Sequence, residues 1–450
     1  MASTKISRTF SSAGNMNKWT ISLWLKRAKL GVEQVIASCY ENSNYQTQIK
    51  FETDDQLYFN DENNGNTNGR IVSNAKYRDT NAWYHMVFIW DKDNSTSGDK
   101  LRMYVNGERV TSFSDTGNAP SASSTWNAAN TTQQFGAKVT SDYFDGLMSH
   151  IHFCDGYAYD PSYFGETDST TGEWKIKTAP SVSYGTNGYF WLKDNVATTD
   201  NSPNSNTFTA SGTLTKTKDC PSNVFATLSP HILPRNSGGS ISNGTLTFGT
   251  SAAQWTTESS AFGITNGKYY FEVKLRDNGN DRRFRWGLQK NAEITKTGNN
   301  KVLGGSDNNV IGYATQGESA TQGSYHINQT QTNLTDGDIN ENNAIYGFAI
   351  DLDNQRMYGH FNGTWLHSGN PSAGTGGIDV SSFYTVGEPL FPSFTVHTSD
   401  IDINFGNGYF GTTAVATNSG SGYQDADGNG IFNYTVPTNY RALCTKGLNQ

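Results

Sequence analysis

The residues best suited to bind a metal lie near the end of the chain, at positions 425–430 (DADGNG). In a calcium loop, oxygen ligands at the first, third and fifth positions, here Asp425, Asp427 and Asn429, converge on Ca²⁺, and a glycine at the sixth permits the sharp turn. The twelfth position, where a bidentate glutamate completes the shell, is Val436. Two interpretations therefore stay open: a Ca²⁺ site, and a solvated turn of Asp, Asn and Gly residues.

Two further polar pairs also have two interpretations each. His150 and His152 are two residues apart, so on an extended strand they share one face. They are either a metal pair, without an identifiable third ligand, or ordinary histidines of a half-buried sheet. Asp351 and Asp353 either face a ligand or cap a turn through Asx-type hydrogen bonds, and we expect the turn.

The sequence contains no established catalytic signature. The G-x-S-x-G elbow, the H-E-x-x-H zinc motif and the P-loop are all missing from it. The nearest approach to the E-x-D-x-x-E strand of concanavalin-like glycosidases is Glu52-Thr53-Asp54, where Leu57 replaces the third carboxylate. Because glycoside hydrolysis needs two carboxylates that face one cleft, we expect a protein that is not an enzyme.

Aromatic residues among Asn, Asp and Ser fit a surface that binds sugars. Such a surface offers a flat ring to the sugar face and polar groups to its hydroxyls. For every candidate, packing in an aromatic-rich core is the alternative role, since aromatic residues make up 13% of the chain. The candidates are Trp126, Tyr143, Trp174, Tyr184, Tyr325 and Trp365.

The composition predicts several all-β domains with a largely neutral surface. A chain of 450 residues suffices for two or three domains, and its 46 glycines fit short strands joined by turns. Charged residues are only 16%, against roughly 25% in ordinary soluble domains. The formal net charge of −8 and the lack of a basic run make nucleic acid an unexpected partner.

Neither membrane insertion nor secretion is expected from the sequence. No apolar run approaches the roughly 20 residues of a membrane span. The first residues, MASTKISRTFSS, lack the apolar region of a secretion signal. The four cysteines are too few and too scattered for a disulfide framework. We expect free buried thiols, with a bridge between Cys39 and Cys154 as the alternative.

Two similar hairpins organise the rest of the chain. Residues 344–366 (AIYGFAIDLDNQRMYGHFNGTWL) read as strand, turn and strand, followed by an Asn-Gly turn. The same pattern occurs at residues 83–110, where WYHMVFIWD leads to LRMYVNGERV. Elsewhere period-two alternation predicts strands, most clearly in residues 18–27 (KWTISLWLKR). Helical periodicity is nearly missing, apart from a single turn that Asp160 caps and Pro161 begins.

The first hairpin and its neighbours resemble the laminin-G-like, concanavalin-A-like jelly rolls. The resemblance rests on KWTISLWLKR, AWYHMVFIWD, LRMYVNGERV and the closing FDGLMSHIHFCDGYAYDPSYFGE. It implies two packed antiparallel sheets, and such families often bind glycans. Fold alone does not assign a function to this sandwich.

The second hairpin lies in a succession that resembles the SPRY domain. The segments are YYFEV, WGL, IGYA, YGFAIDLD…FNG and FPSF. The resemblance implies a bent antiparallel sandwich that usually serves protein interaction. Three long polar loops, 277–283, 291–309 and 316–343, are where recognition is expected on such a sandwich.

Two other segments resemble structural proteins of marine bacteriophages. They are the connector DCPSNVFATLSP at residues 219–230 and the closing FNYTVPTNYRALCTKGL at residues 432–448. This resemblance implies a virion protein on the outer particle surface, made in the host cytoplasm during assembly. Its partners would be other virion proteins and a host-surface glycan or protein, and a homo-oligomer is expected, with a trimer favoured.

The sequence thus predicts an all-β chain with two antiparallel β-sandwiches. The expected parts are a laminin-G-like domain at 1–166, transition strands and a linker at 167–239, a SPRY-like sandwich at 240–410 and a docking tail at 411–450. The expected role is adhesion, as a tail-fibre, head-fibre or decoration component. The alternatives are a purely architectural capsid or tail protein, a secreted lectin-like adhesin, and a glycan hydrolase.

Overall fold

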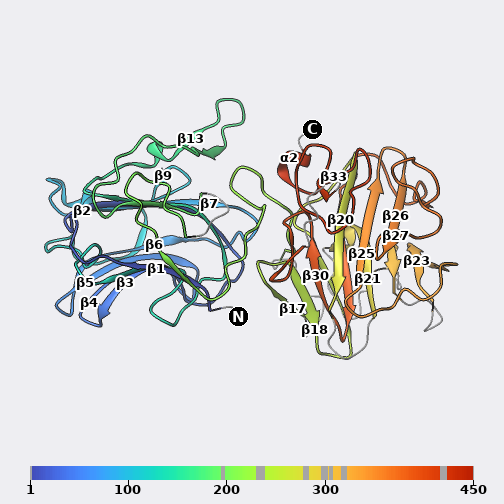
Figure 1. The fold of residues 1–450 in the computed structure, drawn as a ribbon, viewed down its shortest axis with the longest axis horizontal. Coiled ribbons are helices and arrows are strands. Elements are labelled where there is room, and N and C mark those ends of the chain that lie inside the picture. Colours follow the sequence, from blue (N-terminus) through green and yellow to red (C-terminus); the bar gives the residue numbers. More distant parts are fainter. Residues whose placement is uncertain are drawn as a thin grey trace. The chain divides into compact units, whose positions relative to one another are not determined.

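The chain folds into two compact units, Met1–Lys216 and Thr217–Gln450, each described here by itself (Figure 1). The computed structural model describes residues 3–193, 198–229, 239–276, 283–294, 303, 308–315, 322–415 and 423–448. The regular secondary structure of both units is almost entirely antiparallel β-strand. This confirms the predicted all-β class with two antiparallel sandwiches.

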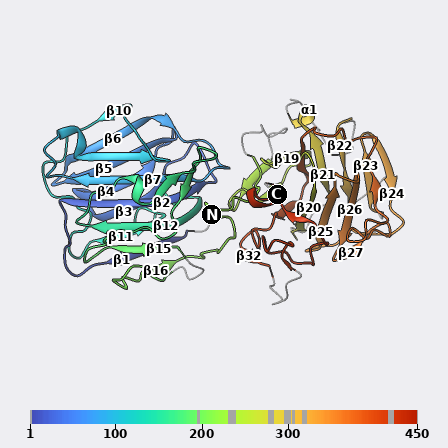
Figure 2. The same ribbon diagram turned by 90° about the horizontal axis from the view of Figure 1, so that it is seen from above.

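The first unit is a sandwich of an eight-stranded and a six-stranded sheet. The strand orders are β10-β6-β5-β4-β3-β11-β1-β16, visible in Figure 2, and β15-β12-β2-β7-β8-β9. The large sheet contains β1 (Lys5–Thr9), β3 (Gln34–Asn42), β4 (Tyr45–Phe51), β5 (Gln56–Asn63), β6 (Asn66–Lys76), β10 (Phe113–Thr116), β11 (Thr132–Phe135) and β16 (Thr209–Ser211). The smaller contains β2 (Lys18–Arg27), β7 (Tyr84–Asp91), β8 (Leu101–Val105), β9 (Glu108–Arg109), β12 (Gly146–Asp155) and β15 (Tyr189–Trp191).

The core of the first unit follows the predicted alternation. Trp19, Ile21, Leu23 and Leu25 on β2 are fully buried between the two sheets, because successive side chains of a strand point to opposite faces. Burying such apolar side chains stabilises the fold by about 1.5–3 kcal/mol each relative to exposure. The period-two prediction for residues 18–27 is confirmed.

A strap between β12 and β15 covers the other face of the six-stranded sheet. It contains η2 (Pro161–Tyr163), β13 (Gly165–Thr167) and β14 (Trp174–Ile176), and Figure 1 shows it over the layer with β2 and β7. A second apolar cluster joins Val87 and Cys154 of the sheet to Phe164 and Tyr184 of the strap. Burial on both faces explains why β7 reads as a continuous apolar run and not as an alternating strand.

The cysteines are free, as expected. Cys39 lies in the core between the sheets, whereas Cys154 faces the strap on the far side of the six-stranded sheet. The alternative of a Cys39–Cys154 bridge is wrong, because a sheet separates the two thiols.

The second unit is also a sandwich of two antiparallel sheets, as the SPRY resemblance implies. One sheet has the order β17-β18-β30-β20-β25-β26-β27, with β28 beside β26 and β33 beside β20; the other has the order β19-β29-β21-β22-β23-β24. The first contains β17 (Gly239–Ser242), β18 (Thr247–Thr250), β20 (Lys268–Leu275), β25 (Ile345–Asp351), β26 (Arg356–Phe361), β27 (Thr364–Trp365), β28 (Ile378–Asp379), β30 (Asp400–Asn404) and β33 (Arg441–Ala442). The second contains β19 (Trp255–Ser259), β21 (Arg283–Lys290), β22 (Val310–Ala314), β23 (Ser324–Ile327), β24 (Thr330–Asn333) and β29 (Leu390–His397).

Three short elements and one small pair of strands complete the chain. They are η1 (Ser97–Asp99), α1 (Asn291–Ile294), α2 (Thr445–Leu448), and the pair β31 (Tyr409–Phe410) and β32 (Thr413–Ala414). The predicted recognition loops 277–283, 291–309 and 316–343 fall wholly or partly outside the described residues.

The C-terminal segment packs on the outer face of the nine-stranded sheet. Phe432, Tyr440 and Cys444 form a buried cluster with Tyr270 and Tyr358 of that sheet. Buried Glu272 on β20 accepts hydrogen bonds from the backbone N–H groups of Asn433 (2.8 Å) and Tyr434 (2.8 Å). The tail is therefore an integral part of the second unit.

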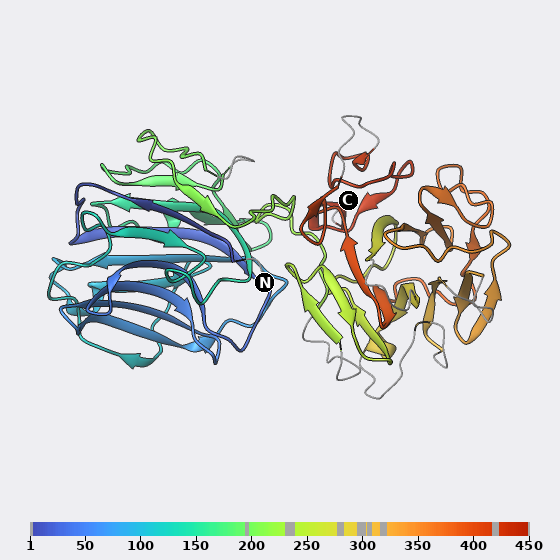
Figure 3. The ribbon, with the colours of Figure 1, turned by 60° about the horizontal axis from the view of Figure 1, so that its bottom comes forward.

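The connector and the closing segment lie close together in the second unit, in green and red in Figure 3. Phe225 and Cys444 form an antiparallel bridge. The Ala226 N–H donates to the Leu443 carbonyl (2.9 Å), and the Thr445 N–H donates to the Val224 carbonyl (2.9 Å). The two segments that resemble bacteriophage structural proteins in sequence thus pair with each other in the structure.

The unit boundary falls near Lys216 and divides the predicted transition segment. Tyr189, Trp191 and Phe208 belong to the core of the first unit, and Ala226 and Leu228 to that of the second. The described part of the segment at 167–239 therefore contributes strands and core residues to both units.

The two Asn-Gly hairpins have the same local structure. Asn106 (φ 50°) and Gly107 (φ 84°) turn β8 into β9, and Asn362 (φ 47°) and Gly363 (φ 86°) turn β26 into β27. In each turn the Asn side chain accepts a backbone N–H, from His85 (2.8 Å) and Ile345 (2.9 Å) respectively. The predicted hairpins and their primed-type turns are confirmed.

A later aromatic residue packs on each turn glycine. A Cβ added at Gly107 would lie 2.7 Å from the Trp174 ring, and one at Gly363 would lie 2.6 Å from the Tyr434 ring. Each turn is therefore a docking point for the segment that covers its sheet: the strap in the first unit and the tail in the second.

Candidate functional site

An open cleft of about 530 Å³ lies at one end of the six-stranded sheet of the first unit. It begins where β12 ends and Gly156 (φ 88°) turns the chain. The Thr20 hydroxyl on β2 fixes the next residues, because it donates to the Tyr157 carbonyl (2.8 Å) and accepts from the Tyr159 N–H (2.9 Å). The Asp160 carboxylate then caps η2 by accepting the Ser162 N–H (3.0 Å), which confirms the predicted turn.

Three tyrosines form the aromatic wall of this cleft. Tyr157 and Tyr159 are stacked, with ring centroids 5.3 Å apart and an interplanar angle of 6°. Tyr163, carried by η2, lies 4.5 Å from Tyr159 at a tilt of 46°. Tyr157 is 39% exposed and Tyr163 is 42% exposed, so both rings offer an open face although each already has an aromatic neighbour.

A polar cluster also lines the cleft. Lys18 at the start of β2 pairs with Asp91 at the end of β7, with Nζ 3.3 Å from Oδ1. Arg102 on β8 approaches the other carboxylate oxygen at 3.8 Å, and Asn94 donates to it at 3.2 Å. Asp91 is largely buried, and its cations hold it in place, while Lys18 keeps 40% of its side chain exposed. The cluster thus presents charged and amide donors that are already oriented.

This arrangement has the chemistry of a carbohydrate site. Flat tyrosine faces suit the C–H faces of a pyranose ring, and oriented N–H donors suit its hydroxyls. The cleft is open and its only carboxylate, Asp91, is held in ion pairs. A pair of carboxylates for glycoside hydrolysis is therefore not present among its lining residues.

None of the six aromatic residues that the sequence singled out lines the cleft. Trp126 is fully buried, with its ring 5.9 Å from Trp19 in the core, so its prediction as a glycan contact is wrong. Tyr184 lies in the strap and is buried against the six-stranded sheet, where its hydroxyl bonds to His152 Nδ1 (2.9 Å). Burial also raises the pKa of Tyr184 above its ordinary value.

The other four candidates are half-buried. Trp174 packs on Gly107, and Trp365 lies against Tyr270 at 6.4 Å in the tail cluster. Tyr143 bridges to Val35, and Tyr325 on β23 packs partly on the core. As glycan contacts these four stay predictions.

His85 shows why a nearby serine is not a nucleophile. The Trp174 indole, which can only donate, gives a hydrogen bond to His85 Nδ1 (3.0 Å). His85 Nε2 therefore carries the proton and donates to Ser22 Oγ (2.9 Å). A base that activates a serine must accept its proton, and burial lowers the pKa of His85 to about 3. This Ser-His pair serves packing.

The predicted histidine pair does not assemble a metal site. The ladder between β12 and β2 shifts register between Ser149 and His152, and His150 adopts φ 48°. His152 is buried, stacked 3.9 Å from the Phe190 ring, and burial lowers its pKa. Among the described residues, no group of three or more His, Cys, Asp or Glu side chains can hold a metal ion.

The Asp425–Asn429 loop uses its oxygens in hydrogen bonds. Asp425 Oδ1 accepts the N–H groups of Asp427 (3.1 Å) and Asn429 (2.6 Å), and its Oδ2 accepts the Ala442 N–H (3.0 Å) on β33. Asp427 pairs with Arg441 at 3.1 Å. Oxygens that face N–H donors and a guanidinium do not converge on Ca²⁺, so the turn is the interpretation that fits.

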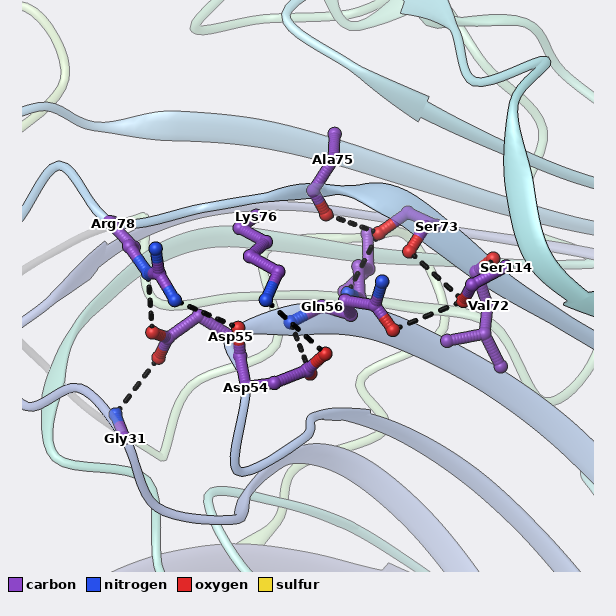
Figure 4. Close-up of polar contacts among 11 residues, drawn as sticks. Gly31, Asp54, Asp55, Gln56, Val72, Ser73, Ala75, Lys76, Arg78 and Ser114 are labelled. Carbon is purple, nitrogen blue, oxygen red and sulfur yellow. Dashed lines mark hydrogen bonds and ion pairs between the residues drawn. The ribbon is translucent and has the colours of Figure 1, made fainter.

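The carboxylates nearest to a glycosidase pattern lie in a turn (Figure 4). β4 ends at Phe51, and Asp54 caps the start of β5 through the Gln56 N–H (3.2 Å). Glu52 pairs with Lys50 (3.1 Å), and Asp54 pairs with Lys76 (3.6 Å). These groups therefore do not share a strand face, which the glycosidase arrangement requires.

Other acidic residues also serve the fold. Asp55 joins Arg27 (3.0 Å) and Arg78 (2.9 Å). Asp351 accepts the Asn354 N–H (2.9 Å), and Asp353 accepts the Gly267 N–H (2.9 Å). The expected turn-capping role is confirmed for Asp351, whereas Asp353 joins the turn to the start of β20.

The sequence contained a signal for the tyrosine cleft that the prediction missed. Tyr157, Tyr159 and Tyr163 fall within seven residues around the Asp160-Pro161 cap. A predicted turn that carries three tyrosines is a compact aromatic surface, but the same residues also fit the closing segment of the jelly-roll pattern.

Comparisons with known proteins support the class of the first unit. Residues 4–158 match the family model of the Concanavalin A-like lectin/glucanases superfamily. No curated protein matches the chain. Among the described residues, no helix has the length and apolar character needed to cross a membrane.

Three solved structures are similar to this chain. They are the SPRY domain of human HERC1 (10% identity, TM-score 0.28, 37% of this chain and 91% of that one), a heptameric SAP-like pentraxin from Limulus polyphemus (16%, 0.27, 35% and 71%) and domains LG4-5 of the mouse laminin alpha1 chain (8%, 0.28, 86% and 78%). TM-scores of this size do not establish a shared fold. The fold assignment rests on strand pairing and on the family match.

Proposed function

We propose that this chain is a non-enzymatic adhesion protein that binds carbohydrate through the tyrosine cleft of its first unit. The observation that carries the proposal is that Tyr157, Tyr159 and Tyr163 line one open cleft together with the Lys18–Asp91–Arg102 cluster. The lectin-type family match of residues 4–158 supports it.

The geometry favours recognition over reaction. The tyrosines are held by the Thr20 and Asp160 hydrogen bonds, so little side-chain or loop entropy is lost when a ligand binds. The donors of the polar cluster are fixed by ion pairs with Asp91. Pre-organised aromatic and polar groups give specificity to a site that is open to long glycan chains.

A glycan array with the full chain tests the proposal. We expect binding to a defined set of saccharides, and a loss of about two- to tenfold in affinity for Tyr157→Ala and Tyr163→Ala, since aromatic contacts contribute roughly 0.5–1.5 kcal/mol. Tyr45→Ala, at the start of β4 and outside the cleft, is the matched control. Equal binding by the cleft variants, or no binding by the wild type, would refute it.

We further propose that the adhesion protein is a component of a bacteriophage particle surface, as a tail-fibre, head-fibre or decoration component. The support is the sequence resemblance of the connector and the closing segment. Its partners are then neighbouring virion proteins, and a trimer is the favoured assembly. Mass spectrometry of purified particles tests this location. A protein found only in host cytoplasm, and not in particles, would contradict it.

The glycan array and the mass spectrometry of particles also distinguish an adhesion protein from a purely architectural particle protein. An architectural protein is present in the particle and binds no saccharide on the array. Light scattering of the purified chain gives the oligomeric state, with three copies expected.

A further inference from the structure

A cationic cluster lies on the outer face of the six-stranded sheet of the second unit. Trp255 on β19, His397 on β29 and Arg283 on β21 stand side by side in the sheet register. Arg285 follows two residues after Arg283 and therefore points to the same face. The inner face of β21, with Phe284 and Trp286, belongs to the core.

Two guanidinium groups share one aromatic ring in this cluster. The Arg285 guanidinium lies 5.0 Å from the Trp255 ring centre, and that of Arg283 lies 5.6 Å from it. Arg283 Nη2 is 3.0 Å from His397 Nδ1, and the His397 ring is 5.1 Å from Trp255. Cation–π contacts stabilise each cation, but the two like charges repel each other.

Arg285 has no carboxylate partner among the described residues. Its Nη1 donates to the Leu303 carbonyl (2.6 Å), and its Nε is buried without a hydrogen-bond partner there. Burial alone lowers its pKa to about 10. Buried arginines ordinarily pair with an anion, because a desolvated guanidinium without one destabilises the fold. The compensating anion is thus expected from outside the described chain.

We propose that Arg283 and Arg285 on the Trp255 face bind a tetrahedral oxyanion, as a free ion or as a phosphate or sulfate group of a saccharide. Guanidinium groups bind such oxyanions through paired, charge-assisted hydrogen bonds. The aromatic ring holds the two arginines in position. This site belongs to the second unit and is independent of the tyrosine cleft in the first.

Isothermal titration calorimetry on the full chain tests the site, with inorganic phosphate and inorganic sulfate as probes at constant ionic strength. We expect saturable binding of one anion, and a loss of about tenfold or more in affinity for Arg285→Gln and for Arg283→Gln, as for a charge-assisted hydrogen bond. Lys274→Gln removes one charge from the other sheet of the same unit and should change the affinity by less than about twofold.

A second experiment distinguishes the source of the anion. Retention on dextran sulfate, with neutral dextran as the reference, reports a group carried on a polysaccharide; binding of the free ions without retention assigns the site to a free anion. Arg285→Gln should keep or raise the melting temperature, because it removes an uncompensated buried charge. No anion binding by the wild type, or unchanged binding by both arginine variants, would overturn the proposal. Loss of this binding leaves Tyr157-dependent saccharide binding intact, so the two sites fail separately.

Discussion

At the scale of single residues, burial shifts the pKa values of the groups that anchor the C-terminal tail on its sheet. Burial raises the pKa of Glu272 to about 7, although four hydrogen bonds to its carboxylate oppose the shift. The neutral His360 accepts the Gly363 N–H at Nδ1 and therefore donates through Nε2 to the Tyr270 hydroxyl (2.7 Å), and burial lowers its pKa to about 3. The tail is thus anchored on groups that are costly to charge.

Glu272 gives the second unit a defined pH dependence. Its pKa in the folded chain, about 7, lies above its ordinary value of 4.5, so its contribution to stability is fully present below pH 4.5 and is lost as the pH rises through 7. We expect the advantage of the wild type over Glu272→Gln in free energy of unfolding to shrink by on the order of 3 kcal/mol between pH 4.5 and 8.

Chemical denaturation at several pH values measures this difference. The buried histidines change stability in the opposite direction, but they are common to both proteins and cancel. Glu108→Gln, at an exposed position on β9, is the control that removes a carboxyl group outside this cluster. A pH-independent gap for Glu272→Gln would contradict the expectation.

Trp174 combines packing with a single buried hydrogen bond. Trp174→Phe keeps an aromatic ring on Gly107 but leaves His85 Nδ1 without its donor. We expect a loss of about 1–3 kcal/mol in the free energy of unfolding, since an unsatisfied buried acceptor costs this much. The control is Trp24→Phe, whose ring stacks on His85 at 4.8 Å without a described hydrogen bond. Equal losses in urea denaturation for both variants would exclude the role of the hydrogen bond.

At the scale of elements, an aromatic residue distant in sequence packs on an Asn-Gly turn in each sandwich. Trp174 packs on the turn between β8 and β9, and Tyr434 packs on the turn between β26 and β27. The turn glycine is required twice, for its positive φ and for its missing Cβ. The similarity of the two hairpins therefore extends from their sequence to the way in which a later segment covers the sheet.

A pair of alanine substitutions separates the two requirements. In Gly363→Ala the φ of 86° is unfavourable and the new side chain clashes with the Tyr434 ring. In Gly374→Ala the φ of 69° is also unfavourable, but the new Cβ lies in open space. We expect Gly374→Ala to cost about 1 kcal/mol and Gly363→Ala to cost more, by the amount needed to displace the ring. Limited proteolysis of residues 423–448 reports the displacement. Equal melting temperatures and equal cleavage would show that Tyr434 gives way freely.

Sequence patterns predicted the long strands well and the covering segments poorly. The alternation of Trp19, Ile21, Leu23 and Leu25 and the Asn-Gly turns are local signals, so β2 and both hairpins could be predicted. β14, β15 and β16 have only three residues each, which is too short for a periodic pattern. The tyrosine cleft depends on bringing Tyr157 beside Asp91 and Arg102, a long-range contact that no local pattern specifies.

At the scale of the whole molecule, the chain consists of two self-contained cores. Each has its own aromatic cluster, built around Trp19, Trp126 and Trp191 in the first and around Trp286, Tyr313 and Phe348 in the second. The residues after the family match, up to about Lys216, complete the first core. A domain cut at the end of the sequence resemblance would therefore be incomplete.

Expression of two fragments tests this boundary. We expect residues 1–216 to fold cooperatively and residues 1–166 to aggregate or unfold, because the shorter fragment lacks Tyr189, Trp191 and Phe208 of the core. Losing three such side chains removes on the order of 10 kcal/mol, which equals the whole stability of a typical domain. Circular dichroism melts and size-exclusion chromatography measure the outcome. A soluble, cooperatively melting 1–166 fragment would place the boundary earlier.

The pairing of Phe225 with Cys444 means that the chain enters and leaves the second sandwich at one place. The first and last segments of that sandwich are therefore adjacent in space. Its ends can be joined by a short peptide and the chain reopened at Val386, which is 79% exposed in the loop before β29, giving a circular permutant with the same strand order in space. Because its two ends are adjacent, the sandwich can also be inserted into a surface loop of another protein without distorting the backbone of either protein.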